Sequence, residues 1–167
     1  MEGAGRAWVF GDNIDTDVLA PGFLMKLPAE ELAKHCLEAV DPDFARNVAP
    51  GDVVVGGENF GLGSSREQAA ISLKVLGVRA VLAKSFARIF YRNAINIGLP
   101  ALFFPDVDEI TAGDRIVVDA GAGRIVNGVT DKTYSVAPIP DHLMHVIAAG
   151  GLMPHLKTRF ATQCSEA

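Results

Sequence analysis

The sequence has little cysteine, no long apolar run and no cluster of basic residues, and each absence excludes a class of protein. Its two cysteines, Cys36 and Cys164, are far apart and form neither a C-x-x-C metal pair nor a disulfide framework. No stretch approaches the roughly 20 apolar residues that a membrane-spanning helix requires, and no signal peptide is evident. The net charge of −5 and the lack of a Lys/Arg run argue against nucleic-acid binding. We therefore expect a cytoplasmic protein, because thiols stay reduced there, with no membrane or nucleic-acid partner.

The chain has the length and composition of one folded domain. A chain of 167 residues suits a single domain, spanning residues 1–167. Hydrophobic residues make up 49% and charged residues 21%, which is typical of a chain that buries a core. We find no internal repeat and no linker that would divide the chain.

Short apolar runs alternate with amphipathic stretches, a pattern typical of an α/β protein. Strands are predicted at 8–10, 53–57, 80–83 and 101–104, and helices at 29–40, 65–76 and 85–98. Strand–helix–strand repeats of this length indicate βαβ units and right-handed crossovers. Three further short strands, at 114–120, 123–128 and 132–138, precede a last helix at 140–151. We predict an α/β fold: a mostly parallel central sheet flanked by helices, with a small antiparallel C-terminal β extension.

The most informative stretch is GENFGLGSSREQAA, residues 57–70. Ser64 and Glu67 fit a capping box, in which the serine caps a helix and the glutamate reaches back to it. The stretch matches neither phosphate-binding glycine loop, because no lysine follows Gly63 and Arg66 stands where a third glycine is needed. A third interpretation is a carboxylate site. The free N–H groups of a helix start and a guanidinium that binds two oxygens at once both attract a carboxylate.

A serine at such a helix start also has a chemical use. An unassisted hydroxyl is a poor base, so a serine removes protons only where N–H donors and a cation stabilise its alkoxide form. Such a site must be electropositive and dry, and one short chain does not obviously supply it. A helix start can be capped and catalytic at once, so both interpretations stay open.

Three segments of the chain resemble the small subunits of 3-isopropylmalate dehydratase and of homoaconitase-type enzymes and, more distantly, the swivelling C-terminal domain of aconitase. They cover residues 11–22, 57–70 and 83–100, and begin GDNIDTD, GENFGLGSSRE and AKSFARIFYRN. The resemblance spans about residues 8–150 and follows the family's order. It implies a swivelling β/β/α domain.

The resemblance also implies a division of labour between two chains. In this family a large subunit holds a [4Fe–4S] cluster, and the small subunit closes over it in a heterodimer or heterotetramer. Two distant cysteines cannot ligate a cluster that needs three or four thiolates, so we expect no cofactor or metal in this chain. By motif position, Ser64 corresponds to the family's catalytic base. Ser65, Arg66 and Asp17 correspond to groups that hold the substrate.

For some of these residues, an ordinary structural role is the alternative to a role in the site. Asp17 follows the first strand in Asp15-Thr16-Asp17, where a turn or helix cap is common. Arg88 and Arg92 are four apart on one helix face. They either support the serine loop, face the partner chain, or form a solvated basic face.

The substrate-selecting loop departs from the family pattern. In the family it resembles R-Y-L followed by an apolar residue or an arginine. Here the segment after Gly22 is Phe23-Leu24-Met25-Lys26, one residue shorter. Met25 suits an apolar substrate tail and Lys26 suits a further carboxylate, so the two interpretations compete. An apolar pocket discriminates by only about 1–3 kcal/mol per methylene, so we expect related malates to be accepted as substrates too.

The resemblance predicts a hydro-lyase subunit that acts on a small branched malate or maleate. The expected reaction converts 2-isopropylmalate into 3-isopropylmalate in leucine biosynthesis. Homoaconitate, citraconate, methylmalate or dimethylmalate are alternative substrates of the same machinery. A stand-alone carboxylate-binding module and a purely structural subunit are the alternatives from other classes.

Overall fold

The computed structural model describes residues 3–165 of the chain, and side chains as far as residue 161. Its centre is one seven-stranded sheet with the strand order β4-β3-β2-β1-β5-β6-β7. The strands are β1 (Gly5–Val9), β2 (Val53–Gly56), β3 (Ala80–Ala83), β4 (Ala101–Phe103), β5 (Arg115–Asp119), β6 (Arg124–Asn127) and β7 (Lys132–Ser135).

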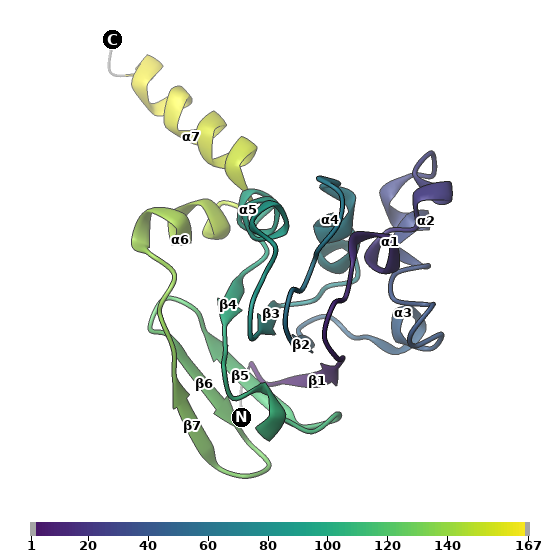
Figure 1. Cartoon of the computed structure of the whole chain (residues 1–167). Helices are drawn as coiled ribbons and strands as arrows, with labels where there is room; N and C mark the ends of the chain where they lie inside the picture. The colour runs from purple at the N-terminus through teal and green to yellow at the C-terminus, as the bar shows by residue number, and fades with distance from the viewer. Residues whose placement is uncertain (1–2, 166–167) are drawn as a thin grey trace.

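Helices connect and flank these strands. They are α1 (Thr16–Leu19), α2 (Ala29–Ala33), α3 (Phe44–Asn47), α4 (Gln68–Val75), α5 (Arg88–Asn96), α6 (Asp141–Ala148) and α7 (Leu152–Ser165), with short 3-10 turns η1 (Gly22–Leu24) and η2 (Val107–Glu109). Figure 1 shows α4 and α5 lying over the parallel strands, while α7 points away from the rest of the molecule. None of the helices between residues 3 and 165 has the length and apolar character that crossing a membrane requires.

The prediction of a mostly parallel sheet is only partly right. Strands β1 to β4 pair in parallel, whereas β1 pairs antiparallel with β5, and β5, β6 and β7 pair antiparallel with one another. The predicted antiparallel extension is present, but it continues the same sheet from the far edge of β1. The turns that link β5, β6 and β7 are short, and only antiparallel neighbours can be joined by such turns.

Both faces of the parallel half are covered, which explains the continuous apolar character of its strands. Val54 and Val81 point into one hydrophobic cluster, together with Leu73 of α4 and Phe90 of α5. The alternate residues of the same strands, including Val53, point into a second cluster on the opposite face. Successive side chains of a strand point to opposite faces, so one short run serves two cores.

The predicted helix over residues 29–40 is wrong beyond Ala33. The backbone of Leu37 adopts a left-handed conformation, with φ of 61°, and its N–H donates to the carbonyl of Val18 at 2.9 Å. This tertiary hydrogen bond replaces the continuation of the helix. Helical spacing puts Leu32, Cys36, Leu37 and Val40 on one apolar face of the predicted helix. The first three are buried, but Val40 is 51% exposed.

Two further predictions about helices need correction. Helix α4 begins at Gln68 instead of residue 65, and α5 begins at Arg88 instead of residue 85. The second difference arises because Phe86 forms a parallel bridge with Phe60, which holds this segment extended. The chain after Gly151 carried no prediction and forms α7.

Candidate functional site

The three motif segments meet at one edge of the sheet. Strands β1, β2 and β3 are parallel neighbours, so the loops that follow them emerge at the same edge. Backbone hydrogen bonds join these loops, from Gly61 N–H to Ile14 O at 2.6 Å and from Ala87 N–H to Phe60 O at 3.0 Å. The carboxyl edge of parallel strands is where open α/β sheets bind ligands. Residues far apart in the sequence therefore form one candidate site.

Ser64 lies beside Thr16, a residue to which no sequence motif assigned a role. The two hydroxyl oxygens are 3.0 Å apart, and the Ser64 N–H donates to Thr16 Oγ1, also at 3.0 Å. Thr16 is only 3% exposed, while Ser64 is exposed. Because Thr16 Oγ1 already accepts the amide hydrogen, its own O–H is free to donate to Ser64 Oγ. The buried threonine thus orients the exposed serine.

The glycine before Ser64 allows this close approach. Gly63 has φ of 115°, a backbone conformation that side chains disfavour. A Cβ at this position would lie 2.9 Å from Thr16 Oγ1. Any larger residue here would push the Thr16 hydroxyl away from Ser64.

The capping-box interpretation of Ser64 and Glu67 is wrong. Glu67 itself is the N-cap residue of α4, and no side-chain hydrogen bond caps this helix start. Ser64 lies upstream of the cap and bonds to Thr16 instead. Ser65 is exposed, and its carbonyl accepts a hydrogen bond from Asn93 Nδ2 at 3.2 Å. The serine pair therefore belongs to a loop that α5 supports.

Arg66 and Asp17 form an ion pair. Arg66 Nη1 donates to Asp17 Oδ1 and, at 3.2 Å, to the carbonyl of Ala20. The hydrogen bond and the positive charge of Arg66 hold the pKa of the Asp17 carboxyl below its usual value. The helix cap that we considered for Asp17 belongs to Asp15, which accepts from Val18 N–H at 2.8 Å.

Two separate hollows flank the serine loop. One, of about 600 Å³, is lined by Ser64 and by residues of its loop and of α5, namely Gly61, Gly63, Ala87, Arg88, Ile89 and Arg92. The other, of about 410 Å³, is lined by Arg66 and by Asp17, Pro21, Gly22 and Phe23. Ser64 and Arg66 thus open into different hollows, although they are two positions apart.

Met25 and Lys26 lie outside both hollows as the described residues form them. Met25 is half-buried and packs against the hydrophobic cluster on the α4 face, whereas Lys26 is exposed. Phe23, which the sequence analysis noted only as a departure from the family pattern, is 84% exposed and lines the Arg66 hollow. The roles of Met25 and Lys26 in selecting substrate stay predictions.

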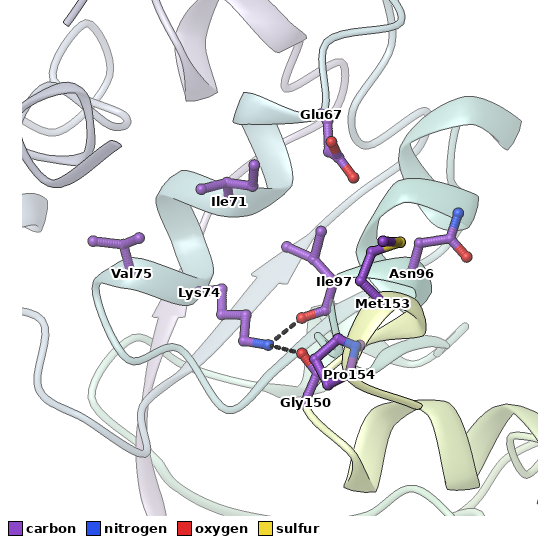
Figure 2. A pocket seen from close by; sticks show the side chains of 10 residues that line it. Glu67, Ile71, Lys74, Val75, Asn96, Ile97, Gly150, Met153 and Pro154 are labelled. Atoms are coloured by element: carbon purple, nitrogen blue, oxygen red, sulfur yellow. Dashed lines mark hydrogen bonds between the residues drawn. The ribbon is translucent and has the colours of Figure 1, made fainter. Parts of the chain in front are cut away.

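A third hollow lies on another part of α4 and has a structural explanation. Figure 2 shows Lys74 reaching from α4 to the ends of α5 and α6, where its Nζ donates to the carbonyls of Ile97 and Gly150. Lysines commonly satisfy the free carbonyls of helix ends in this way. Burial lowers the pKa of Lys74. The residues that line this hollow include none of the predicted site residues.

Among the described residues, no group of three or more His, Cys, Asp or Glu side chains has a geometry suited to a metal ion. Cys36 is fully buried in the hydrophobic cluster, and burial raises the pKa of its thiol. It therefore behaves as a core residue, as its helical pattern predicts. The side chain of Cys164 lies outside the described residues.

The fold and the serine loop define an aconitase-type domain, and residues 32–107 match the family model described as the aconitase C-terminal domain. The chain is 50% identical over 159 residues to "3-isopropylmalate dehydratase small subunit 2" of Archaeoglobus fulgidus, covering 94% of this chain and 96% of that protein. It is 53% identical over 154 residues to the 3-isopropylmalate dehydratase small subunit of Nautilia profundicola, covering 92% and 93%. The chain therefore belongs to the family of 3-isopropylmalate dehydratase small subunits.

A solved structure resembles the whole chain. The crystal structure of 3-isopropylmalate dehydratase from Methanocaldococcus jannaschii superposes with a TM-score of 0.93 at 45% sequence identity. The superposition covers 98% of each chain. The likeness extends through the antiparallel strands and the C-terminal helices, beyond the residues that the family model matches.

Proposed function

We propose that this chain is the small subunit of a 3-isopropylmalate dehydratase, a hydro-lyase of leucine biosynthesis. With its large subunit it interconverts 2-isopropylmalate and 3-isopropylmalate by removing and re-adding water. The observation that carries the proposal is the hydroxyl pair of Ser64 and Thr16, because Ser64 lines a hollow together with two arginines. The near 50% identity to small subunits of this name supports the same assignment.

The partner in this proposal is an iron–sulfur large subunit, in a heterodimer or heterotetramer formed in the cytoplasm. Its [4Fe–4S] cluster supplies a Lewis acid for the hydroxyl and one carboxylate of the substrate. The assignment of the cluster to the partner follows from the family resemblance, and two distant cysteines could not ligate a cluster that needs three or four thiolates. In this complex the small subunit, residues 1–167, contributes a single domain.

Ser64 is the proton acceptor in the proposed mechanism. Its Oγ removes the proton from the carbon next to a substrate carboxylate and returns it to the neighbouring carbon during isomerisation. The proposal takes the Thr16 O–H as the donor of the 3.0 Å hydrogen bond between the two hydroxyls, because a donor to the Ser64 oxygen favours its ionised form. Removing the proton builds negative charge on the substrate carboxylate, and preorganised donors stabilise that charge.

Arg66 and Ser65 hold a substrate carboxylate in this proposal. The guanidinium of Arg66 has five N–H donors, and only Nη1 is used by Asp17 and Ala20. The remaining donors are available to a carboxylate in the Arg66 hollow. Asp17 acts as a support that fixes the orientation of the guanidinium.

The exposed ring of Phe23 favours a substrate with an apolar branch, because it adds apolar surface to the Arg66 hollow. Met25 supports the same choice by its apolar character. Lys26 supports the alternative of a further carboxylate, as in homoaconitate. Citraconate, methylmalate and dimethylmalate are smaller branched alternatives.

We expect Thr16→Val to lower kcat of the assembled enzyme by about 10- to 100-fold, because a hydrogen bond to a charged oxygen is worth about 1.5–3 kcal/mol. The pH–rate profile should move to higher pH, since the ionised form of Ser64 is harder to reach without the donor. Thr16→Ser keeps the hydroxyl and is the matched control. Equal activity of the two variants would show that Thr16 only fills space.

A turnover assay under anaerobic conditions tests the proposed function. The chain is assayed alone and after mixing with a reconstituted large subunit from the same genome, with isopropylmalate, homoaconitate, citraconate and dimethylmaleate as substrates. We expect activity only in the mixture, fastest with isopropylmalate. Tight dicarboxylate binding by the chain alone, with no turnover with any partner, would instead support a carboxylate-binding module.

A further inference from the structure

Asn93 is a buried polar residue on an otherwise apolar part of α5. It is 8% exposed, and the other buried side chains of this helix, Phe90, Ala94 and Ile95, are hydrophobic. An amide in such surroundings is unfavourable unless it is hydrogen-bonded. Its Nδ2 donates to the carbonyl of Ser65 at 3.2 Å, the only hydrogen bond of this side chain within the part of the chain that the structure describes. The one polar contact of Asn93 is thus with the serine loop, residues 57–67.

The need to satisfy a carbonyl does not explain this contact. Ser65 is an exposed residue, and water satisfies the backbone of exposed loops. The same face of α5 supports the loop at a second point, since Phe90 lies three positions before Asn93. A Cβ on Gly61 would lie 2.1 Å from Phe90 Cγ, so the loop backbone rests directly on this ring. Helix α5 therefore fixes where the loop lies.

The residues on either side of Ser65 are both held from α1. The N–H of Ser64 donates to Thr16 Oγ1 at 3.0 Å, and the guanidinium of Arg66 donates to a carboxylate of the same helix. Asn93 holds the backbone between them from α5, and α1 and α5 lie on either side of α4 (Figure 1). The bond is made by the carbonyl of Ser65 and not by its hydroxyl, which the proposed function assigns to the substrate.

We propose that Asn93 is a positioning residue for the proton transfer, which fixes the backbone between Ser64 and Arg66 and so the place of the base relative to the bound carboxylate. The inference rests on the proposed function, because it takes Ser64 as the proton acceptor. Ser64 follows Gly63, whose φ is 115°, and glycine restricts the backbone least. The Ser64 side chain therefore keeps one direction only if the backbone is held on both sides. A misplacement of about 1 Å slows a reaction by about 100-fold.

The test uses the assembled complex with Asn93→Leu and Asn93→Ala. Leucine keeps the branched shape of asparagine without a donor, and alanine removes the donor without adding volume. We expect each variant to lower kcat by about 10- to 100-fold and to change KM for isopropylmalate by less than about threefold, because Arg66 keeps its own partners. The matched control is Asn96→Leu on the same helix. Asn96 lines the third hollow (Figure 2), so this variant should keep kcat.

A kinetic isotope effect separates positioning from a loss of folded enzyme. With isopropylmalate that carries deuterium at the carbon that loses the proton, the isotope effect on kcat should be larger in both Asn93 variants than in the unmodified complex. A misplaced base makes proton transfer more nearly rate-limiting, whereas a smaller amount of folded enzyme leaves the isotope effect unchanged. An unchanged kcat would overturn the proposal. So would a lower kcat that only parallels a loss of assembled complex in ultracentrifugation, with the isotope effect unchanged.

Hydrogen–deuterium exchange of the full chain tests the role of Asn93 in the loop without turnover. Peptides that cover residues 61–67 should exchange faster in both Asn93 variants than in the unmodified chain or in Asn96→Leu, because a loop that is held less firmly opens more often. If the unmodified complex does not turn over isopropylmalate, the proposed function fails, and exchange still decides whether Asn93 fixes the loop. Unchanged exchange over these residues would contradict the inference by itself.

Discussion

Replacing Ser64 with alanine is expected to lower kcat of the assembled complex by about 100- to 10,000-fold, the contribution typical of a positioned general base. The side chain is exposed, and the only contact of its hydroxyl among the described residues is with Thr16. Removing one exposed oxygen leaves the fold and the contact surface nearly unchanged, so assembly should be preserved. A large loss of rate with intact assembly separates a catalytic from a structural role.

Steady-state kinetics and analytical ultracentrifugation together provide this measurement. Ser135→Ala is the matched control, since Ser135 is an exposed serine on β7, in the antiparallel half of the sheet. It should retain full activity. A fully active Ser64→Ala complex would show that the small subunit contributes only structure, and it would remove the proton acceptor from the proposed mechanism.

The largest expected effect on stability is that of Asp52→Ala. Asp52 is 5% exposed and accepts three hydrogen bonds of 2.9 Å, from the indole of Trp8 and from the backbone N–H groups of Arg6 and Ala49. It thereby ties the start of β2 to β1 and to the loop before it. Alanine leaves these donors without an acceptor, and each unsatisfied buried group costs about 1–3 kcal/mol. We expect the free energy of unfolding to fall by about 3–6 kcal/mol.

Chemical denaturation monitored by Trp8 fluorescence measures this change, because the chain has one tryptophan. Asp119→Ala is the comparison, since Asp119 is exposed and accepts one hydrogen bond, from Ala122 N–H at 3.0 Å. That variant should lose less than about 1 kcal/mol, as is usual for surface positions. A loss of this small size for Asp52→Ala would mean that water replaces the carboxylate, and the tie between β1 and β2 would not depend on it.

The sequence alone determined the parallel half of the fold and the segments that form the site. The runs at 53–57 and 80–83 are rich in apolar residues because both of their faces are buried, and such runs predict strands without reference to partners. The glycines and serines of 57–70 marked the loop after β2 by residue type. Ser64, Arg66 and Asp17 were named from these local patterns and the family resemblance, and their roles in the reaction stay predictions.

The tertiary structure decided which of these groups face one another. Thr16 and Ser64 are 48 positions apart, and their hydroxyls meet only because β1 and β2 are parallel neighbours. Other tertiary contacts keep Ser64 away from the helix cap, replace the continuation of α2 beyond Ala33, and direct Arg66 to Asp17. Local patterns report propensity and burial, whereas such contacts depend on how distant strands align. Hydrogen bonds between distant segments then override the local preference.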